Sequence, residues 1–538
     1  MALQPGLANR LLLAALALAL ALAVYGPALR GPFLSDDLHY VEQNAYLHEL
    51  TPANLWEILS PSGAAARNVV NWSPVQLLLH AAVWQLCAED TLGHHLLNLL
   101  LHTGASLLLL PLFARMGIPR ALALFGAGAF LLHPANVEAV AWISQLKSSS
   151  ALLLSLAALL LQPRRPGAAA GVFLLALLAK PNAAFALPVG ALLLASEGRP
   201  QPWRWHALCA LGFAAFALVE FGVHQRSGAA PAELHAEPFL LLRSVLALLA
   251  RYAWMAATSL GVSAFHEPEP ARSLADPWWL AALLLVGGIG WRCAALLRRP
   301  GRVSPELACW AWAAISFAPV SQIFPFLYPM ADRYLYFILP GLLGAALLAG
   351  REGSERAARR WPWIAGAAAP RGLLAVAALG LLLAFSVRAH ARARIWRSPV
   401  WLMADAAAHY PDGVAGQLQR AKRAAQEGDI DGVVRGIRAA IGRGYNRFEQ
   451  LQEDPAWAPV ARHPRFQALV HEVAASRIRW FESQASLTQL EWRGLAAAHL
   501  ARRERREALA ALERALATGG AQDELVRQEI EGLRRFVD

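Results

Sequence analysis

Runs of apolar residues, separated by short polar or basic turns, fill the first 390 positions of the chain. An apolar run of about 20 residues can cross a bilayer as an α-helix, because each helical residue adds about 1.5 Å. The pattern predicts eleven transmembrane helices. They are residues 11–24, 94–113, 121–132, 139–161, 167–195, 205–222, 239–262, 278–297, 307–323, 334–348 and 363–385. A cleaved signal peptide is the alternative for the first run, but no clean cleavage site stands apart from it.

Two apolar stretches depart from this pattern. Residues 167–195 are interrupted by Lys180-Pro181-Asn182, and we interpret them as one broken helix, because proline removes a backbone hydrogen bond and kinks a helix. Two half-spans are the alternative interpretation. Residues 75–87 are too few for a confident span, and they predict a helix that lies in the membrane interface.

Basic residues indicate the orientation of the spans, because cytoplasmic turns collect Lys and Arg. With the N-terminus inside, eleven spans place four basic turns inside and the acidic loop positions outside. The basic turns hold Arg115 and Arg120, Arg164 and Arg165, Arg298, Arg299 and Arg302, and Arg351, Arg356, Arg359 and Arg360. The outer positions are Asp36, Asp37, Glu138, Glu267, Glu269, Asp332 and Arg333.

The composition changes after the last span. From about Arg388 the chain is rich in Ala, Arg, Glu and Gln, with helical periodicity. One stretch matches the spacing of a tetratricopeptide repeat, and an unrelated helical hairpin is the alternative. The matching positions are Trp492, Leu495, Ala496, His499, Ala508, Leu512 and Ala515. We therefore expect a membrane domain at residues 1–390, with an outer loop at 30–92, and an extracytoplasmic helical domain at 391–538.

Composition supports this division. The chain has 538 residues, of which 57% are hydrophobic and 16% charged, as in a polytopic membrane protein. The net charge of +11 follows from the basic turns and does not indicate nucleic-acid binding. The four cysteines lie far apart in apolar stretches and predict small core residues rather than metal ligands. The fold class that we expect is all-α.

Charged residues at the mouths of the spans are the candidates for chemistry. Asp36 and Asp37 directly follow the first span, and carboxylates so near lipid are costly. A solvated loop is the alternative. His94, Asn98 and His102 share one helical face, but the two histidines are about 12 Å apart along the axis, too far for one metal ion. We expect that face to form hydrogen bonds between helices.

Five short motifs, in one order along the chain, resemble the transmembrane-and-tetratricopeptide-repeat O-mannosyltransferases and their bacterial relatives, which belong to the C-type glycosyltransferase (GT-C) superfold. The motifs are Phe33-Leu34-Ser35-Asp36-Asp37 with Asn44, His94-His95-Leu96-Leu97-Asn98 with His102, His133-Pro134 with Glu138-Ala139-Val140-Ala141, Ala331-Asp332-Arg333-Tyr334-Leu335-Tyr336 with Pro340, and Trp396-Arg397-Ser398 with Trp401 and Tyr410-Pro411. The chain departs from the family at Lys180-Pro181, where Lys-Glu is usual, and in its few, degenerate repeats.

The resemblance implies a lipid-phosphate sugar donor, whose phosphate leaves without needing a proton. The acceptor hydroxyl then needs one general base, and we assign that role to Asp36, because an ionised carboxylate accepts a proton. Asp37 would orient the acceptor, the base or an ion, and two adjacent like charges should raise the pKa of one of them. Arg333 would bind the phosphate as a fork, with an ion pair to Asp332 as the alternative. Lys180 is a second phosphate candidate.

Three further residues are assigned to orienting the substrate or an ion. Glu138 could hold a cation or the sugar, or simply favour the helix dipole. His133 could touch the sugar or cap a helix. Asp332 completes the set. A divalent cation is possible, and the sequence identifies no metal site.

The expected function is transfer of a sugar, mannose by resemblance, from a polyprenyl phosphate to a protein Ser or Thr hydroxyl, with inversion. The enzyme would lie in a bacterial inner membrane, with its site and C-terminal domain on the periplasmic side. The alternatives are transfer to a lipid or cell-surface glycan, and an inactive membrane scaffold whose repeats bind a partner. The expected partners are the donor, the acceptor and membrane lipid, without nucleic acid.

Overall fold

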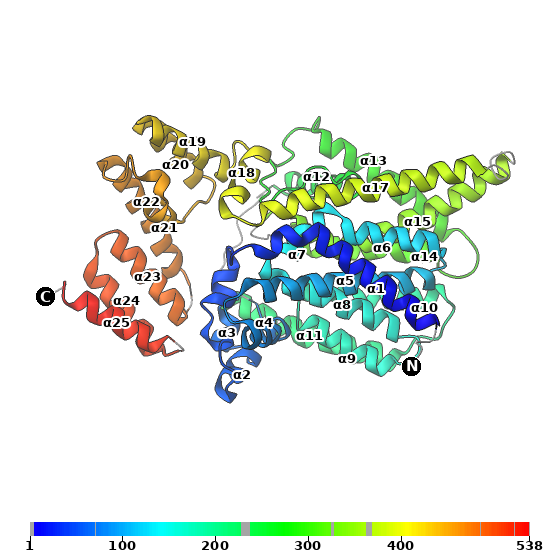
Figure 1. Ribbon diagram of the computed structural model, residues 1–538, viewed down its shortest axis with the longest axis horizontal. Coiled ribbons are helices and arrows are strands. Elements are labelled where there is room, and N and C mark those ends of the chain that lie inside the picture. The colour runs from blue at the N-terminus through cyan, green and yellow to red at the C-terminus, as the bar shows by residue number, and fades with distance from the viewer. Residues whose placement is uncertain are drawn as a thin grey trace.

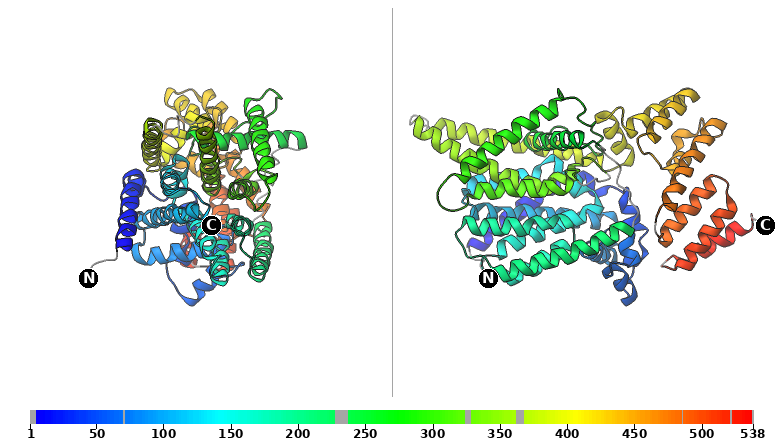
Figure 2. Two further views of the ribbon diagram at one scale, coloured as in Figure 1. Left: turned by 90° about the vertical axis from the view of Figure 1, so that its right-hand side faces the viewer. Right: turned by 180° about the vertical axis from the view of Figure 1, so that it is seen from behind.

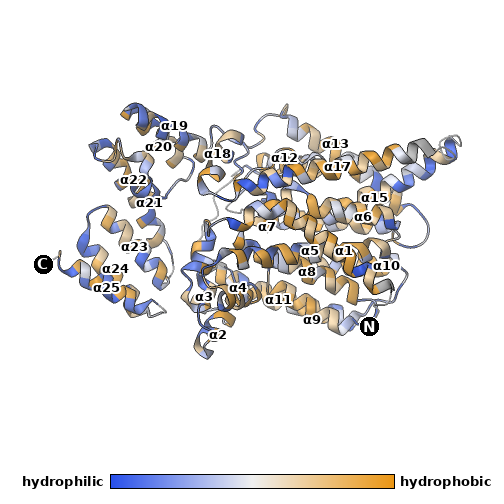
Figure 3. Ribbon diagram, in the orientation of Figure 1, coloured by the Kyte–Doolittle hydropathy of each residue, from blue (hydrophilic) through white to orange (hydrophobic). Residues whose placement is uncertain are grey.

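The computed structural model describes residues 5–69, 71–226, 237–323, 328–361, 368–484, 486–520 and 522–536. Helices make up 78% of the structure, and the described residues contain no strand, which confirms the all-α class. A bundle of long helices forms the first part, and a smaller group of helices lies beyond one end of it (Figure 1). The bundle is mainly apolar, whereas the smaller group mixes polar and apolar residues (Figure 3).

Several helices of the bundle begin at a proline, a residue that favours the first helical position. Proline occupies the first position of α9, α12, α13 and α14, where its missing N–H is not needed. The bounds are α1 Pro5–Tyr25, η1 Gly26–Arg30, α5 Thr91–Arg115, α6 Arg120–Leu132, η4 Pro134–Asn136, α7 Val137–Ala141, η5 Ile143–Gln145, α8 Leu146–Leu161, α9 Pro166–Leu177, η6 Pro181–Phe185, α10 Ala186–Ser196, α11 Trp203–Arg226, α12 Pro238–Thr258, α13 Pro277–Leu297, α14 Pro305–Phe317, η7 Ala318–Val320, η8 Asp332–Tyr334, α15 Leu335–Arg360 and α17 Ala368–Ile395.

Eight helical stretches of the described chain are long and apolar enough to cross a membrane. The helix pair α6 and η4–α7, bent by 48°, makes a ninth if it is one span. The helices α9, α10 and α14 are apolar but shorter. The chain is therefore an integral membrane protein by the length and composition of its helices.

The basic turns gather at one end of the bundle, which we call the arginine end. Arg115 pairs with Glu197, and Arg302 Nη1 donates to the Glu197 carbonyl at 3.0 Å. Arg351 Nη1 donates to the Gly117 carbonyl at 2.6 Å. Turns that are far apart in sequence thus meet at this end, as the arginine pattern predicted.

The acidic positions gather at the opposite end, which we call the carboxylate end. Asp37 is bonded to Ser144, and Glu138 is paired with Arg333. The C-terminal helices lie beyond this end (Figure 1).

The interpretation of residues 167–195 as one broken span is wrong. Arg115 donates to the Leu159 carbonyl, near the end of α8, and also pairs with Glu197, just after α10. The segment between them therefore starts and finishes at the arginine end.

Its turning point is Lys180, whose Nζ donates to Ser148 Oγ at 2.8 Å, at the carboxylate end. The residue before a proline is forced out of the helical region, and Lys180 is extended, with φ −161° and ψ 136°. The chain reverses there instead of kinking, so α9 and α10 form a hairpin.

The predicted span 239–262 also has a different course. Arg243 Nη1 donates to the Arg272 carbonyl at 3.0 Å, and Tyr252 Oη donates to the Ala331 carbonyl at 3.2 Å. Both partners belong to loops of the carboxylate end, so α12 lies across that end rather than along the bundle. The view along the bundle shows this helix crossing the others (Figure 2, left).

The outer loop 30–92 folds into a small unit with its own core of Leu47, Ile58, Ala65, Val69, Leu77 and Ala81. It contains η2 Leu38–Glu42, which is a π-helical turn, η3 Ala45–Leu47, α2 Pro52–Leu59, α3 Ala64–Arg67 and α4 Pro74–Cys87. The predicted helix 75–87 is thus present as α4.

The C-terminal helices pack as successive hairpins around a second core. They are α18 Pro399–His409, α19 Val414–Glu427, α20 Ile430–Ile441, α21 Phe448–Glu453, η9 Pro455–Trp457, α22 Pro464–Glu482, α23 Gln489–Ala501, α24 Arg505–Thr518 and α25 Asp523–Arg534. The residues at the repeat spacing are buried between α23 and α24, except the half-buried Trp492 and His499.

The first and last helices of the bundle lie side by side. Ala21, Val24 and Tyr25 of α1 share a core with Phe385 and Ala389 of α17. A Cβ on Gly31 would lie 2.7 Å from the carbonyl oxygen of Trp396, so only glycine fits where the chain leaves η1.

Candidate functional site

The two adjacent carboxylates point in different directions because of a strained turn. Ser35 has φ +52°, a left-handed conformation that is uncommon for a residue with a side chain. Such outliers cluster at functional sites. The turn buries Asp37, which is 1% exposed, and leaves Asp36 partly exposed at the carboxylate end.

Asp37 holds the turn to the bundle. Its Oδ2 accepts from the Leu34 N–H at 3.0 Å, and its Oδ1 accepts from the N–H of Ser144 at 2.7 Å and from the Ser144 hydroxyl. Burial raises the pKa of Asp37 to about 7, although these three hydrogen bonds oppose the rise. The negative charge of Asp36 adds only a small increase, so burial is the main cause of the expected pKa shift.

Asp36 makes few polar contacts, and its charge acts on two tyrosines. Its side chain has one weak contact, from Ser35 Oγ at 3.5 Å. Burial raises the pKa values of Tyr40 and Tyr328, the charge of Asp36 raises them further, and the charge of Arg333 lowers them. The charges of Asp36 and Arg333 therefore act in opposite directions on the same two phenol groups.

Arg333 pairs with Glu138 and not with its neighbour Asp332. The Arg333 guanidinium donates to Glu138 Oε1, and the Arg333 N–H donates to Oε2 at 2.7 Å. Three aromatic rings surround the guanidinium carbon, those of Trp142, Tyr328 and Tyr334, with centroids at 5.2, 5.3 and 5.0 Å. The partner of Glu138 is thus an arginine of a distant motif.

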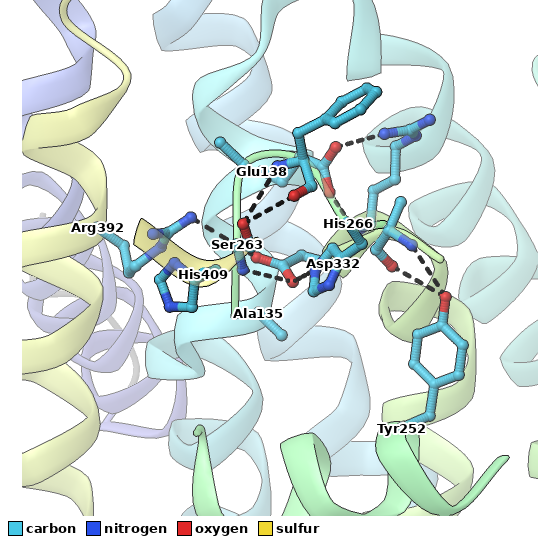
Figure 4. A network of polar contacts seen from close by, with 12 residues as sticks. Ala135, Glu138, Tyr252, Ser263, His266, Asp332, Arg392 and His409 are labelled. Carbon is cyan, nitrogen blue, oxygen red and sulfur yellow. Dashed lines mark hydrogen bonds and ion pairs between the residues drawn. The ribbon is translucent and has the colours of Figure 1, made fainter. Parts of the chain in front are cut away.

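Asp332 turns away from this pair. Its Oδ1 lies 2.7 Å from His266 Nε2 and accepts from the Ser263 N–H at 3.2 Å, and its Oδ2 lies 3.9 Å from Arg392 (Figure 4). His266 Nδ1 lies 3.0 Å from the Tyr410 hydroxyl. Asp332 therefore belongs to a buried polar network that includes His266 and extends through it to Tyr410, at the end of α18.

Two lysines complete the cationic side of the site. Lys180 Nζ bonds to Ser148 Oγ and lies 5.7 Å from the Phe337 ring centroid. Lys147 Nζ lies 5.0 Å from the ring centroid of Tyr40. No carboxylate of the described residues lies within ion-pair distance of either lysine. Both interact electrostatically with Arg333, and Lys147 also does so with Asp36.

Lys147 is the site residue that sequence reasoning missed. It lies six residues after Ala141, within a stretch that we treated as one apolar span. A charged residue inside such a stretch is itself a signal for function, and it could have been used here.

His133 has both ring nitrogens engaged. Its Nδ1 accepts from the Ala135 N–H at 3.2 Å, so the proton is on Nε2, which donates to the Ala256 carbonyl at 3.2 Å. The ring is fully buried. The capping arrangement that we considered for this residue is therefore present.

The polar face of α5 forms the expected hydrogen bonds between helices. Asn98 Nδ2 donates to the Trp142 carbonyl at 3.0 Å and Asn98 Oδ1 accepts from Ser149 Oγ at 2.8 Å. His102 Nδ1 lies 3.0 Å from the Tyr336 hydroxyl. His94 instead bonds locally, to the Ala88 carbonyl.

Within the described ranges, no group of three His, Cys, Asp or Glu side chains could hold a metal ion. A divalent cation remains a prediction. The arrangement itself offers one partly exposed carboxylate, Asp36, whose charge acts on Arg333 and Lys147, and both of these basic residues interact electrostatically with Lys180. The site could take a proton at the carboxylate and hold an anion at the basic residues.

Comparison with known proteins gives no relative. No family model, no curated protein and no solved structure matches the chain.

Proposed function

We propose that the chain is a GT-C-type glycosyltransferase that moves a sugar, mannose by resemblance, from a polyprenyl phosphate to a protein Ser or Thr hydroxyl. The observation that carries this proposal is that one carboxylate of the site, Asp36, has almost no partner within the protein, while the same site holds the basic residues Arg333, Lys147 and Lys180. Asp36 makes one weak contact, whereas Asp37, Glu138 and Asp332 are all bonded inside the protein.

In the proposed reaction Asp36 removes the proton of the acceptor hydroxyl as its oxygen attacks the anomeric carbon. The bond from that carbon to the phosphate oxygen breaks, and the polyprenyl phosphate leaves with the electron pair. Attack from the opposite side inverts the anomeric centre. Arg333, Lys147 and Lys180 stabilise the departing phosphate, whose negative charge grows as the bond breaks.

Glu138 has a supporting role in this proposal. It accepts one hydrogen bond from the Arg333 guanidinium and one from the Arg333 backbone N–H, so that arginine is positioned before the donor arrives. His133 and Asp332 position the backbone around the site through the hydrogen bonds described above, and a divalent cation could add to the phosphate charge stabilisation.

We also propose eleven crossings, with the site and the C-terminal domain on the periplasmic side of a bacterial inner membrane. The hairpin α9–α10 contributes two crossings, α12 contributes none and α14 contributes one. The C-terminal hairpins would serve as degenerate tetratricopeptide units, and no nucleic acid takes part.

The test is turnover of purified variants with polyprenyl-phosphate mannose and a Ser/Thr peptide. Asp36→Asn keeps the side-chain shape but accepts no proton, so turnover should fall about 10² to 10⁴-fold while donor affinity is unchanged. Glu42→Gln, an exposed residue of the same loop, is the control and should keep full turnover. Normal turnover in Asp36→Asn would refute the general base.

A second arm of this test addresses the phosphate. Arg333→Lys keeps the charge but not the fork, so donor affinity should fall roughly tenfold to a hundredfold. Unchanged donor affinity in this variant would remove Arg333 from the phosphate site. Transfer to a glycan or lipid in place of the peptide would favour the alternative acceptor.

A further inference from the structure

Two carboxylates from different parts of the chain are connected by one loop. Asp332 lies in η8 of the bundle, and Asp405 lies in α18, the first of the C-terminal helices. The loop after α12 contacts both of them. The Ser263 N–H donates to Asp332 Oδ1 at 3.2 Å, and the next N–H, that of Ala264, donates to Asp405 Oδ2 at 2.9 Å. Two consecutive amide groups thus connect η8 to α18.

Two side chains make further connections between the same elements. Arg392 of α17 donates through Nη1 to Asp405 Oδ1 at 2.5 Å, and its Nη2 lies 3.9 Å from Asp332 Oδ2. His266 Nε2 lies 2.7 Å from Asp332 Oδ1, and its Nδ1 lies 3.0 Å from the hydroxyl of Tyr410, which directly follows α18. Asp332, His266 and Arg392 are at most 7% exposed, so water competes little for these contacts (Figure 4).

The turn that contains Asp332 also carries Arg333, and both neighbours of Asp332 are bonded to other elements. The Tyr252 hydroxyl of α12 donates to the Ala331 carbonyl at 3.2 Å and accepts from the Ala331 N–H at 3.0 Å. The Arg333 N–H donates to Glu138 of α7 at 2.7 Å. Because Arg333 is one peptide bond from Asp332, a shift of Asp332 would move the guanidinium. A displacement of about 1 Å at a binding group can cost about a hundredfold in rate.

We propose that α18 forms part of the donor site, because Asp405 and Tyr410 position Arg333 through Asp332. This inference rests on the proposed function, and it gives the first C-terminal helix a role in binding the donor phosphate. His266 and Arg392 are positioning residues, since they act on Asp332 and not on the donor. The coupling is reciprocal: if the packing of α18 favours donor binding, bound donor favours that packing by the same factor.

The first test needs no donor. Hydrogen–deuterium exchange of the full-length protein in nanodiscs reports how often the turn at residues 331–334 opens. Tyr410→Phe removes one hydroxyl and Asp405→Asn removes one charge, and each should speed that exchange about fivefold. His206→Leu is the matched control. It removes another buried histidine contact, to Gln162 at 2.9 Å near the arginine end, and should leave the exchange of residues 331–334 unchanged.

The second test is the affinity of the same variants for polyprenyl-phosphate mannose. His266→Leu loses the contacts to Asp332 and Tyr410, so affinity should fall about tenfold. His266→Gln keeps a side-chain N–H that can reach Asp332, so it should recover most of that loss. A purely structural role of His266 would lower the melting temperature without changing the donor affinity of the folded protein. Added donor should also slow the exchange of residues 399–410 in the native protein.

Unchanged exchange of residues 331–334 in both Tyr410→Phe and Asp405→Asn would overturn the proposal. Native donor affinity in a folded His266→Leu variant would overturn it as well. The two proposals can fail separately. If the native protein binds no donor while both C-terminal variants speed the exchange of residues 331–334, the proposed function is refuted and the connection from α18 to Arg333 stands.

Discussion

Asp36 and Asp37 are neighbours in the chain, but they have different surroundings and different expected roles. The positive φ of Ser35 sends one carboxylate toward the site and the other into the bundle. Asp37 then receives three hydrogen bonds in a buried position, so it fixes the turn that carries Asp36. The two carboxylates thus differ in burial and in hydrogen bonding, and for that reason the proposed general base is Asp36 and not Asp37.

Asp37 should make stability depend on pH. Its pKa in the folded protein is raised to about 7, above the ordinary value of 3.8, so the folded state holds the proton more tightly. Its contribution to the free energy of unfolding is complete below about pH 4 and is lost as the pH rises through about 7. The melting temperature, followed by tryptophan fluorescence, should therefore fall between pH 5 and 8 by a larger amount in the native protein than in Asp37→Asn. Parallel curves for the two proteins would contradict this.

At the scale of helices, the structure departs from the predicted path of the chain at the hairpin α9–α10 and at the transverse helix α12. The two departures have opposite effects on the number of crossings. In the proposed topology the hairpin turns at Lys180 and adds one crossing to the predicted path, whereas α12 stays at the carboxylate end and removes one. The helices from α13 onward therefore keep the direction that the arginine pattern indicated. Lys180 is brought beside Lys147 and Arg333 only because the chain reverses there.

Cysteine labelling in a variant without the four native cysteines should detect the hairpin. Asn182→Cys, at the turn, should react with an impermeant maleimide added outside. Pro200→Cys, beyond α10, should react only after the membrane is permeabilised. One broken span would give the opposite result for Pro200→Cys, because that residue would then lie outside.

Sequence reasoning identified the class of fold and the two ends of the bundle, because basic turns and acidic loop positions alternate along the chain. It could not identify the course of α9–α10 or of α12. A proline break fits a kink or a reversal equally well, and a lateral helix can have the same apolar composition as a span. The ion pair between Arg333 and Glu138 was also missed. The two residues are 195 positions apart in the sequence, and Asp332, which directly precedes Arg333, was the obvious local partner for that arginine.

At the scale of the whole molecule, the C-terminal domain is fixed to the bundle by a few polar contacts. Glu267 accepts from the Val414 N–H at 3.1 and 2.8 Å, at the start of α19. The Asp332–His266–Tyr410 contacts lie close to this junction. The C-terminal domain is therefore attached next to Asp332, the neighbour of the proposed phosphate ligand Arg333.

Glu267→Ala should loosen this attachment by about 1–3 kcal/mol, since it leaves a helix N-terminus without its acceptor. Limited proteolysis of the folded protein should then cut at residues 410–413 more quickly. Glu269→Ala is the matched control, because Glu269 is 69% exposed and pairs with Arg443 on the surface, where such pairs contribute little. Equal cutting rates in the two variants would show that Glu267 does not hold the domain.

The close approach of Gly31 to the Trp396 carbonyl has a consequence for biogenesis. The ribosome delivers the first helix long before the last one, so the turn that presents Asp36 cannot reach its final packing until α17 has been inserted. Until then the early helices would lie in the bilayer without the packing of Gly31 against Trp396. The proposed transferase activity should therefore appear only after the chain through Trp396 has been made, and a nascent chain that stops before α17 should contain Asp36 without the final packing of its turn.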